Sequence, residues 1–297
     1  MRYITRHMSL LQCLRCNCYS MAPSYYVDDF ICAPTCPWSP SASAVALWLD
    51  ASDLSTIVKV GNSVGKWKDK KNSGAIYGEA PLASREPQYG AASLGGKPGI
   101  TFSKADDTLL EIKGGDISAA AVDWTIFAVY SSTDWLGVAG YYGGYIVGRP
   151  AAISTSLLLY DWAPAGGATE TYGYWSPGGW VSCGVLASPT SPHMAVFRLK
   201  STDQATIRDN GTPITACNAS AFASVAVPVD SVIGNSNKVA TNQLDGTIGE
   251  LLMYTGNSTD SEVEKIEGYL AWKWGLEGSL PASHPYKSQK PLRPWGT

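Results

Sequence analysis

The sequence lacks the features that mark several common classes of protein. None of its apolar runs approaches the roughly 18 uninterrupted residues of a transmembrane helix, so we expect no membrane partner. Charged residues make up only 16% of the 297 residues, both signs are interspersed, and the formal net charge is −3. Because binding to a phosphate backbone needs a basic stripe, we expect no nucleic acid partner either.

Histidine is also scarce, which limits the catalytic chemistry open to the chain. Only His7, His193 and His284 occur, too few for a three-histidine zinc site. The glucanase spacing E-x-D-x-x-E is absent, as are H-E-x-x-H and the phosphate-binding P-loop. Glu250 is the strongest single carboxylate, but no second one lies two or four residues away. We therefore predict that the protein is not an enzyme, because general acid and base need two such groups.

Cysteine is unevenly distributed, with a cluster before residue 37. The cluster consists of Cys13, Cys16, Cys18, Cys32 and Cys36. So short a segment has little apolar core, which makes crosslinks or a metal the natural explanations. Disulfides, a zinc ion or iron–sulfur cluster bound by four thiolates, and free thiols all remain open. Cys183 and Cys217, the two remaining cysteines, either pair or are buried singly.

The composition changes near residue 43. Residues 1–43 are rich in Cys, Tyr, Pro and Ser, and their prolines predict an irregular arm, which we expect to be an anchor. Its apolar stretch 8–14 is short and runs into Arg15, so we expect no cleaved signal peptide. In residues 44–297, short β-branched or aromatic runs recur between turn residues, which predicts an all-β domain. Asp209-Asn210-Gly211 predicts a tight hairpin within it.

One segment near the C-terminus has the pattern of a helix. Thr259 and Glu262 fit a capping box, apolar residues follow at 263, 266, 270 and 274, and Gly275 is expected to end the helix. Its glutamates Glu262, Glu264 and Glu267 are expected to form a solvated face. His284, beyond the helix, is expected to have a structural role. Four large side chains are expected to fill the space between two sheets: Trp48, Trp67, Phe102 and Phe127.

Several motifs together resemble a known family. They are Leu47-Trp48-Leu49-Asp50, Trp67-Lys68-Asp69, Asp106-Asp107-Thr108-Leu109, Gly246-Thr247-Ile248-Gly249-Glu250 and the closing stretch 264–286. These motifs resemble the laminin G-like, concanavalin A-like jelly-roll domains of bacterial and phage proteins. The resemblance covers about residues 44–291. It implies a two-sheet antiparallel β-sandwich with a short C-terminal helix.

The resemblance implies a function as well as a fold. It implies a non-enzymatic structural protein of a bacteriophage virion, in the tail, baseplate or capsid surface, assembled in the host cytoplasm. Its partners would be other virion proteins, further copies of itself and glycans of the host surface. Two alternatives remain open: a secreted or surface glycan-binding module of a bacterium, and a glucanase-like hydrolase.

Two sets of residues are candidates for ligand contact, although no cofactor is required. The Gly-rich stretch 140–180 carries aromatic side chains whose flat faces and polar tips suit a sugar or protein surface. The candidates are Tyr141, Tyr142, Tyr145, Tyr172, Tyr174, Trp175 and Trp180. The alternative is that they fill the core between the sheets. Asp106 and Asp107 flank a strand, where carboxylates either cap turns or bind calcium.

Overall fold

The computed structural model describes most of the chain from residue 37 onward. The described residues are 37–41, 45–71, 74–132, 144–148, 159–162, 170–176, 179–186, 190–202, 205–214, 225–227, 231–235 and 243–293. Regular structure in this part of the chain is nearly all β-strand, with one α-helix and short 3₁₀ turns. That helix is too short and too polar to cross a membrane.

The elements follow one another along the chain in this way. The strands are β1 (Leu47–Asp50), β2 (Ile57–Val60), β3 (Ser63–Lys68), β4 (Tyr77–Glu79), β5 (Gln88–Leu94), β6 (Lys97–Phe102), β7 (Leu110–Lys113), β8 (Ser118–Val122), β9 (Trp124–Ser132), β10 (Gly144–Gly148), β11 (Leu159–Trp162), β12 (Glu170–Ser176), β13 (Gly179–Leu186), β14 (His193–Leu199), β15 (Thr206–Asp209), β16 (Thr212–Pro213), β17 (Val225–Val227), β18 (Val232–Ile233) and β19 (Gly246–Thr255). The helix is α1 (Asp260–Trp274), and the 3₁₀ turns are η3 (Leu54–Thr56), η4 (Ala83–Arg85) and η6 (Glu277–Ser279).

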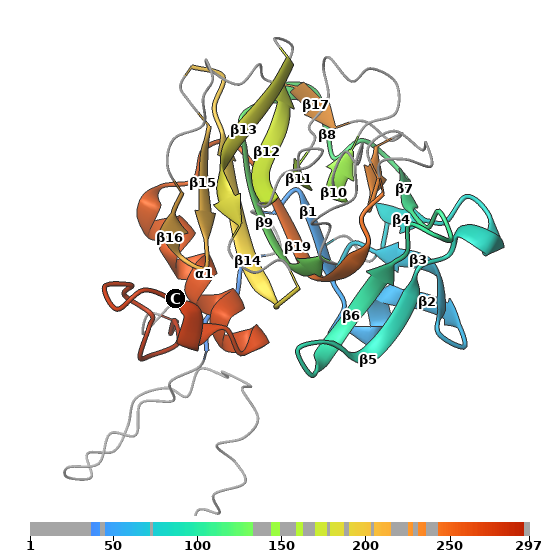
Figure 1. Ribbon diagram of the computed structural model, residues 1–297, viewed down its shortest axis with the longest axis horizontal. Coiled ribbons are helices and arrows are strands. Elements are labelled where there is room, and N and C mark those ends of the chain that lie inside the picture. Colours follow the sequence, from blue (N-terminus) through green and yellow to red (C-terminus); the bar gives the residue numbers. More distant parts are fainter. Residues whose placement is uncertain are drawn as a thin grey trace, which may run out of the picture.

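Most of the strands form two layers of antiparallel sheet, and β8 and β17 pair with each other in a separate two-stranded sheet (Figure 1). One layer has the order β1-β19-β9-β14-β15-β16. The other has the order β13-β12-β11-β10-β18-β7-β4-β3-β2. Strands β5 and β6 link the layers at one edge, because β6 pairs with β19 and β5 pairs with β3. The predicted all-β antiparallel sandwich with a short C-terminal helix is confirmed.

Four strands of the first layer, β1, β19, β9 and β14, are buried on both faces. Trp67 and Phe102 belong to a core that lies between the two layers. Trp48 of β1 and Phe127 of β9 belong to a second core, against α1, while their neighbours along each strand face the first. Alternate residues of a strand point to opposite faces, so one apolar strand serves both cores. The expectation that Trp48 and Phe127 fill the space between the sheets is therefore wrong.

Helix α1 lies against the outer face of this layer, beside β14 and β16 in Figure 1. The predicted capping box is present: Glu262 N donates to Thr259 Oγ1 (3.3 Å), and Thr259 N donates to Glu262 Oε2 (2.8 Å). Gly275 ends the helix with a φ of 75°, in the left-handed region. The predicted apolar face is buried through Val263, Ile266, Leu270 and Trp274.

The predicted hairpin joins β15 to β16. Asn210 and Gly211 have φ angles of 47° and 78°, which are the positive values that a two-residue hairpin turn requires. The turn packs on the C-terminal segment, since a Cβ at Gly211 would lie only 3.0 Å from Leu280 and 3.1 Å from His284. Glycine at this position therefore allows both the turn and its close approach.

Residues 37–41 lie on the sandwich, although the sequence assigned them to the arm. Pro37 forms a β-bridge with Leu292, and Trp38 N donates to Pro291 O (2.9 Å). The Trp38 side chain packs against the core that α1 covers. The division of the chain at residue 43 stays a prediction.

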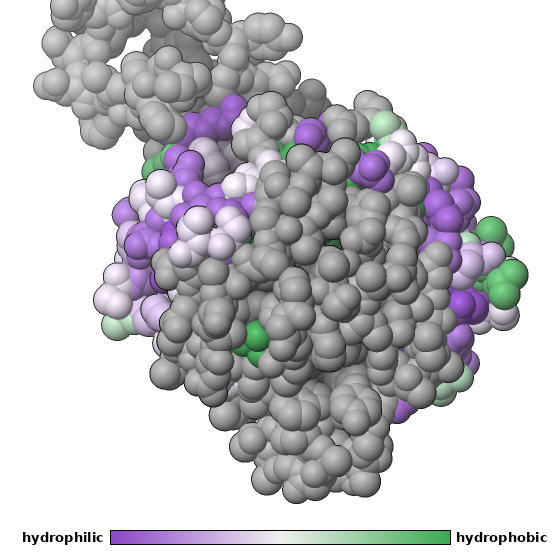
Figure 2. Space-filling model, turned by 90° about the horizontal axis from the view of Figure 1, so that it is seen from above, coloured by the Kyte–Doolittle hydropathy of each residue, from purple (hydrophilic) through white to green (hydrophobic). Residues whose placement is uncertain are grey.

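The surface differs between the two flanks of the molecule. Figure 2 shows hydrophobic surface at the right edge, the flank that carries the β2–β3 hairpin in Figure 1. The exposed large apolar side chains near this hairpin are Leu54, Val58, Val60 and Leu82. The opposite flank, which carries α1, is largely hydrophilic where Figure 2 is coloured.

Candidate functional site

A buried ionic cluster connects α1 to the strands beneath it. Asp50 of β1 and Glu250 of β19 are direct partners across the ladder, so their side chains share a face. Lys273, in the last turn of α1, reaches both, with its Nζ 2.7 Å from Asp50 Oδ2 and 2.7 Å from Glu250 Oε2. Lys70 Nζ also lies 2.8 Å from Asp50 Oδ2. The cluster thus joins segments that are far apart in the sequence.

The Glu250 carboxylate is fully buried and accepts four hydrogen bonds. The donors are Lys273 Nζ (2.7 Å), Trp48 Nε1 (2.7 Å), Trp274 Nε1 (2.6 Å) and the Tyr269 hydroxyl (3.4 Å). A carboxylate offers about four lone-pair positions, so Glu250 has no acceptor position left.

The Asp50 carboxylate is equally buried and equally occupied. Its donors are Lys70 Nζ, Lys273 Nζ, and the backbone nitrogen and hydroxyl of Ser52 at 3.0 and 2.6 Å. Both carboxylates therefore act as acceptors within the fold, and neither presents a lone pair to a substrate.

The pKa values of the two carboxyl groups move in opposite directions. Burial opposes ionisation of Asp50, but the ammonium groups of Lys273 and Lys70 outweigh it and hold the pKa of Asp50 below its ordinary value. Burial raises the pKa of Glu250, and the Asp50 carboxylate adds to this effect while Lys273 opposes it. Opposite shifts are also a mark of acid–base pairs, but here burial and complete hydrogen bonding exclude a substrate.

Sequence reasoning missed this pair because it searched near Glu250 along the chain. Asp50 lies on the neighbouring strand but close to the opposite end of the sequence. The signal that was available is an acidic residue at the edge of, or within, an apolar strand, in Leu47-Trp48-Leu49-Asp50 and in Gly249-Glu250-Leu251. A buried acid needs a cation, and Lys273 lies between Trp272 and Trp274 in the segment predicted to be the helix.

A cavity of about 250 Å³ opens beside the cluster. Residues 37–39, the last turns of α1 and the C-terminal segment form its walls. The lining residues are Pro37, Trp38, Ser39, Tyr269, Trp272, Lys273, Lys290 and Pro291. Tyr269 and Lys273 belong to both the cavity and the ionic cluster, so the cluster fixes one wall of the cavity.

Three aromatic rings shape the cavity. Trp38 and Tyr269 meet edge to face with ring centroids 6.2 Å apart, and Tyr269 meets Trp48 in the same way at 6.4 Å. Trp272 is 37% exposed, and its Nε1 donates to Tyr286 O at 2.9 Å. A ring whose polar tip is held in this way presents its apolar surface in a fixed position, which suits stacking on a ligand.

A second cavity, of about 290 Å³, lies where β6, β9 and β19 meet. Hydroxyl-bearing residues form much of its lining, which consists of Thr101, Phe102, Ser131, Ser132, Thr190, Asp245, Gly246 and Thr247. The hydroxyls of Thr101 and Thr247 are hydrogen-bonded to each other (2.9 Å). Phe102, the aromatic residue among them, is fully buried. This cavity offers polar contacts but no exposed aromatic surface for stacking.

The sequence assigned Glu267 to a solvated face of α1, but the structure buries it. It is 0% exposed, and it accepts two hydrogen bonds from Arg208 of β15, at 2.7 and 2.9 Å. His284 Nε2 lies 3.2 Å from the same carboxylate, in the structural role predicted for that histidine. The expectation is wrong for Glu267 because the β15–β16 hairpin and the C-terminal segment cover this part of the helix.

Most of the other predicted site residues lie outside the described structure. These are the five N-terminal cysteines, Tyr141 and Tyr142, and Cys217. The five other aromatic candidates lie on strands: Tyr145 on β10, Tyr172, Tyr174 and Trp175 on β12, and Trp180 on β13. Trp175 and Trp180 are partners across the β12–β13 ladder. The structure describes the backbone of these five residues but not their side chains. Cys183 is disulfide-bonded. The predicted contacts and the thiol or metal chemistry of the arm stay predictions.

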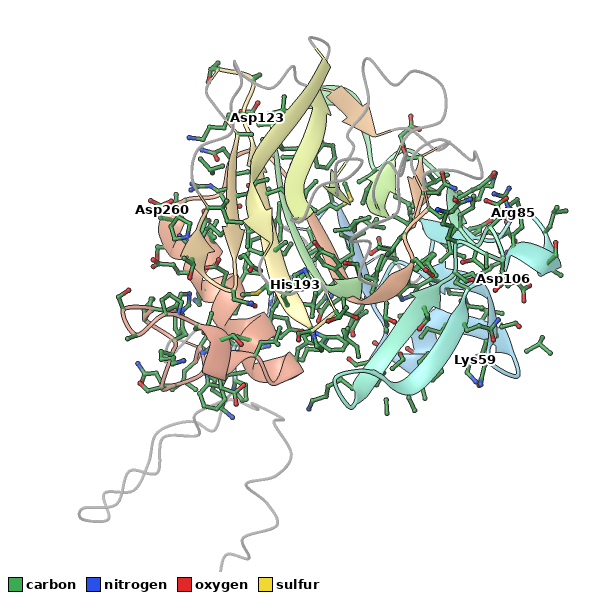
Figure 3. All side chains as sticks on the ribbon, viewed as in Figure 1. Lys59, Arg85, Asp106, Asp123, His193 and Asp260 are labelled. Atoms are coloured by element: carbon green, nitrogen blue, oxygen red, sulfur yellow. The ribbon has the colours of Figure 1, made fainter. Side chains whose placement is uncertain are left out.

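Asp106 lies far from α1, on the flank where Figure 3 also labels Arg85. The Asp107 carboxylate pairs with Arg85 Nη2 (2.5 Å) and accepts a hydrogen bond from Gln243. Asp106 is exposed, and its backbone nitrogen donates to Ser103 Oγ (3.3 Å). The described residues contain no group of three or more side chains that could together hold a metal. Calcium at this position stays a prediction.

A serine in the spacing G-x-S-x-G occurs at Gly61-Asn62-Ser63-Val64-Gly65. In hydrolases this spacing places a nucleophile on a turn between a strand and a helix. Here it spans the turn between β2 and β3, and Ser63 Oγ accepts a hydrogen bond from Gln88 (3.0 Å). The motif is therefore part of a hairpin.

No protein-family model matches this chain, and no curated protein sequence does. Solved structures match it at low sequence identity. The binding domain of Paraclostridial Mosquitocidal Protein 1 aligns with a TM-score of 0.50 and 11% identity, over 77% of this chain and 52% of that chain. This similarity supports the β-sandwich fold and, at such identity, nothing beyond the fold.

Two further matches have lower TM-scores. Domain 4 of AbnA, a GH43 extracellular arabinanase from Geobacillus stearothermophilus, in complex with arabinotriose, aligns with a TM-score of 0.46 and 12% identity, over 75% of this chain and 98% of that domain. Trypanosoma rangeli sialidase in complex with the inhibitor DANA aligns with a TM-score of 0.48 and 12% identity over 79% of this chain. The matched region spans only 34% of the sialidase.

Proposed function

We propose that this chain is a non-catalytic, lectin-like module that binds glycans. The observation that carries the proposal is the cavity beside α1, whose lining combines the aromatic residues Trp38, Tyr269 and Trp272 with Lys273 and Lys290. The C–H faces of sugar rings stack on aromatic rings, and their hydroxyl groups bond to polar neighbours. A ring that is held in place before binding lowers the entropic cost of binding.

The absence of catalysis is part of the proposal and rests on the ionic cluster. A glycosidase needs one carboxyl group that donates a proton and a second that attacks or activates water. Asp50 and Glu250 both bond to Lys273 of the cavity wall, and both are buried with every acceptor position filled. The glucanase-like alternative therefore finds no support at this site.

Binding of the full chain to an array of glycans tests the proposal. We expect binding that is lost in Trp272→Ala, because that change removes exposed ring surface from the cavity wall. Tyr89→Ala, on β5 of the far flank, is the matched aromatic control and should bind as the unchanged chain does. Each variant is first checked for a cooperative thermal transition. Binding that survives Trp272→Ala in a folded variant places glycan recognition elsewhere, with the stretch 140–180 as the next candidate.

The absence of turnover is measured separately. The glycans that bind are incubated with the chain, and newly formed reducing ends are assayed. Release of reducing ends that disappears in Glu250→Gln would overturn the non-catalytic part of the proposal.

We further propose that the module works on a bacteriophage virion, in the tail, baseplate or capsid surface, with residues 1–43 as its anchor to other virion proteins or to copies of itself. The laminin G-like resemblance of the sequence supports this placement. The rival placement is a secreted or surface module of a bacterium. An antibody against the chain distinguishes them: the virion placement requires signal in purified particles, and signal confined to culture supernatant contradicts it.

A further inference from the structure

The cavity beside α1 has an excess of positive charge. The described residues that line it include two lysines, Lys273 and Lys290, and no acid. Asp50 and Glu250 behind the wall balance the charge of Lys273, so Lys290 carries the uncompensated charge of the lining. Lys290 is exposed and forms no ion pair with any described residue. Lys265 is not one of the lining residues, but its Nζ lies 4.7 Å from the centre of the Trp38 ring and adds positive charge next to that wall. An anionic ligand would gain from this charge, and a cationic one would be repelled.

Lys273 is fixed in a way that leaves one donor available. An ammonium group has three N–H donors, and Asp50 and Glu250 take two of them. The ammonium group therefore stays in place without a ligand, since two buried carboxylates hold it. Its side chain is 20% exposed, and it lines the cavity. The same ammonium group lies 5.6 Å from the centre of the Tyr269 ring and 5.4 Å from that of the Trp274 ring.

Lys290 differs from Lys273 in what holds it. It comes from the C-terminal segment, next to Pro291, whose carbonyl accepts the Trp38 backbone N–H (2.9 Å). The segment is thus tied to the wall that carries the Trp38 ring, while the ammonium group itself remains in solvent. One cation of the cavity is rigid and the other is adjustable, with aromatic rings beside them.

We propose that this cavity binds the negatively charged residue of an acidic glycan, with its sugar ring against Trp38 and Trp272 and its carboxylate on Lys273 and Lys290. The inference rests on the proposed glycan binding and adds the class of ligand. A neutral sugar would use the aromatic rings but would gain little from two ammonium groups. An anion without a ring would use the ammonium groups but would gain little from the aromatic surface.

The test uses a matched pair of probes: a galacturonate oligomer, and the same oligomer after its carboxyl groups are reduced to primary alcohols. Binding to the full chain is measured by calorimetric titration. We expect the acidic oligomer to bind at least about tenfold more tightly than the reduced one, because charge-assisted hydrogen bonds are lost with the carboxylates. Raising the salt concentration from about 0.05 M to about 0.5 M should reduce the difference in affinity between the two oligomers, because salt screens the charges.

Lys290→Gln locates the effect within the cavity. It removes an exposed charge without touching the buried cluster, and we expect it to weaken binding of the acidic oligomer about fivefold. Lys59→Gln, an exposed lysine on β2 at the far flank (Figure 3), is the control of equal charge and should leave that affinity unchanged.

The possible failures are distinguishable. Equal affinity for both oligomers keeps the proposed glycan binding and overturns the acidic ligand. Equal loss of affinity in Lys290→Gln and Lys59→Gln shows that only overall charge matters and overturns the cavity as the site. Binding of neither oligomer overturns the acidic ligand, and if the glycan array is also empty, the proposed function fails with it.

Discussion

Helix α1 is held to the sandwich by two buried ion clusters of opposite polarity. In one, the helix supplies the acid, Glu267, which faces Arg208 of β15 and His284. In the other, the helix supplies the base, Lys273, which faces Asp50 and Glu250 of the sheet. Both helix residues lie in the second half of α1. The two clusters therefore share the same helix and differ in which charge the helix supplies.

The two clusters differ in how their charges balance. Glu267 pairs with the Arg208 guanidinium through two hydrogen bonds, which is the strongest geometry for such a pair. Lys273 is shared between two carboxylates, and Glu250 has no other charged donor among its hydrogen-bond partners. The cluster that shapes the cavity is therefore the more dependent on a single residue.

Lys273→Met is the most severe test of this difference. It leaves two fully buried carboxylates with one remaining ammonium group, that of Lys70, which Asp50 shares with Asp53. Removing one partner of a buried ion pair costs about 3–5 kcal/mol, so we expect the free energy of unfolding in urea to fall by that amount at neutral pH. Lys273→Arg keeps the charge and should lose less. A loss of under about 1 kcal/mol for Lys273→Met would show that the ionic cluster does not hold α1.

Glu267→Gln should cost less, about 2–3 kcal/mol of unfolding free energy. The change breaks the two-bond pair, but Arg208 still donates to Gly211 O (2.8 Å), and its side chain is 15% exposed. The stranded charge is therefore partly solvated, unlike the carboxylates left by Lys273→Met. Urea unfolding of both variants ranks the two losses of unfolding free energy. A larger loss for Glu267→Gln than for Lys273→Met would show that the Arg208 pair, and not the Lys273 cluster, contributes more to stability.

The two carboxyl groups of the Lys273 cluster should contribute to the pH dependence of stability in opposite senses. The pKa of Asp50 lies below its ordinary value of 3.8, so its contribution is present above that pH and is lost as the pH falls through the folded value. The pKa of Glu250 lies above its ordinary value of 4.5, so the folded state binds its proton more tightly, and stability falls as the pH rises from 4.5 through the folded value.

Removal of Lys273 should therefore cost more at high pH than at low pH. Without the ammonium group, protonation is the remaining way to relieve the buried Glu250 charge. We expect the difference in unfolding free energy between Lys273→Met and the unchanged chain to be larger by about 1–2 kcal/mol at about pH 7.5 than at about pH 4.5. A difference that is the same at both values would mean that Glu250 is not the group left unpaired.

The sequence predicted the local elements well and their partners poorly. The capped helix and the Asn210-Gly211 turn depend on neighbouring residues, so their signals are local. Alternation in a strand shows which residues share a face, but not which face lies between the sheets. Because α1 covers the outer face, both faces of β1 and β9 are apolar, and Trp48 and Phe127 were assigned to the wrong one.

The site was less predictable than the fold for a related reason. Glu267 reads as one more glutamate of a charged helix until β15 brings Arg208 to it. The partnership of Asp50 with Glu250 depends on pairing between the first strand and the last. The rings of Trp38 and Trp272 form a cavity only because residues 37–41 fold back onto the C-terminal segment.

Two truncations sharpen the boundary between the arm and the sandwich. Deletion of residues 1–36 keeps Trp38, whereas deletion of residues 1–40 removes its ring contact with Tyr269 and the cation–π contact from Lys265. We expect both chains to fold. The longer deletion should lower the unfolding free energy by about 1–2 kcal/mol more, and it should abolish glycan binding at the cavity. Equal stability of the two chains would show that Trp38 only rests on the surface.

Thr259→Ala should have the smallest effect and shows what holds α1 besides its ion clusters. The change removes the side-chain acceptor of Glu262 N and half of the capping box, which costs about 1 kcal/mol. Thr259→Asp, which keeps an acceptor at this position, should retain most of that stability. Isolated helices of this length are marginal, so packing and ion clusters are expected to outweigh the cap. If Thr259→Ala lowers the unfolding free energy as much as Lys273→Met does, then α1 depends mainly on the capping of its N-terminus, and the two buried ion clusters do not determine its position.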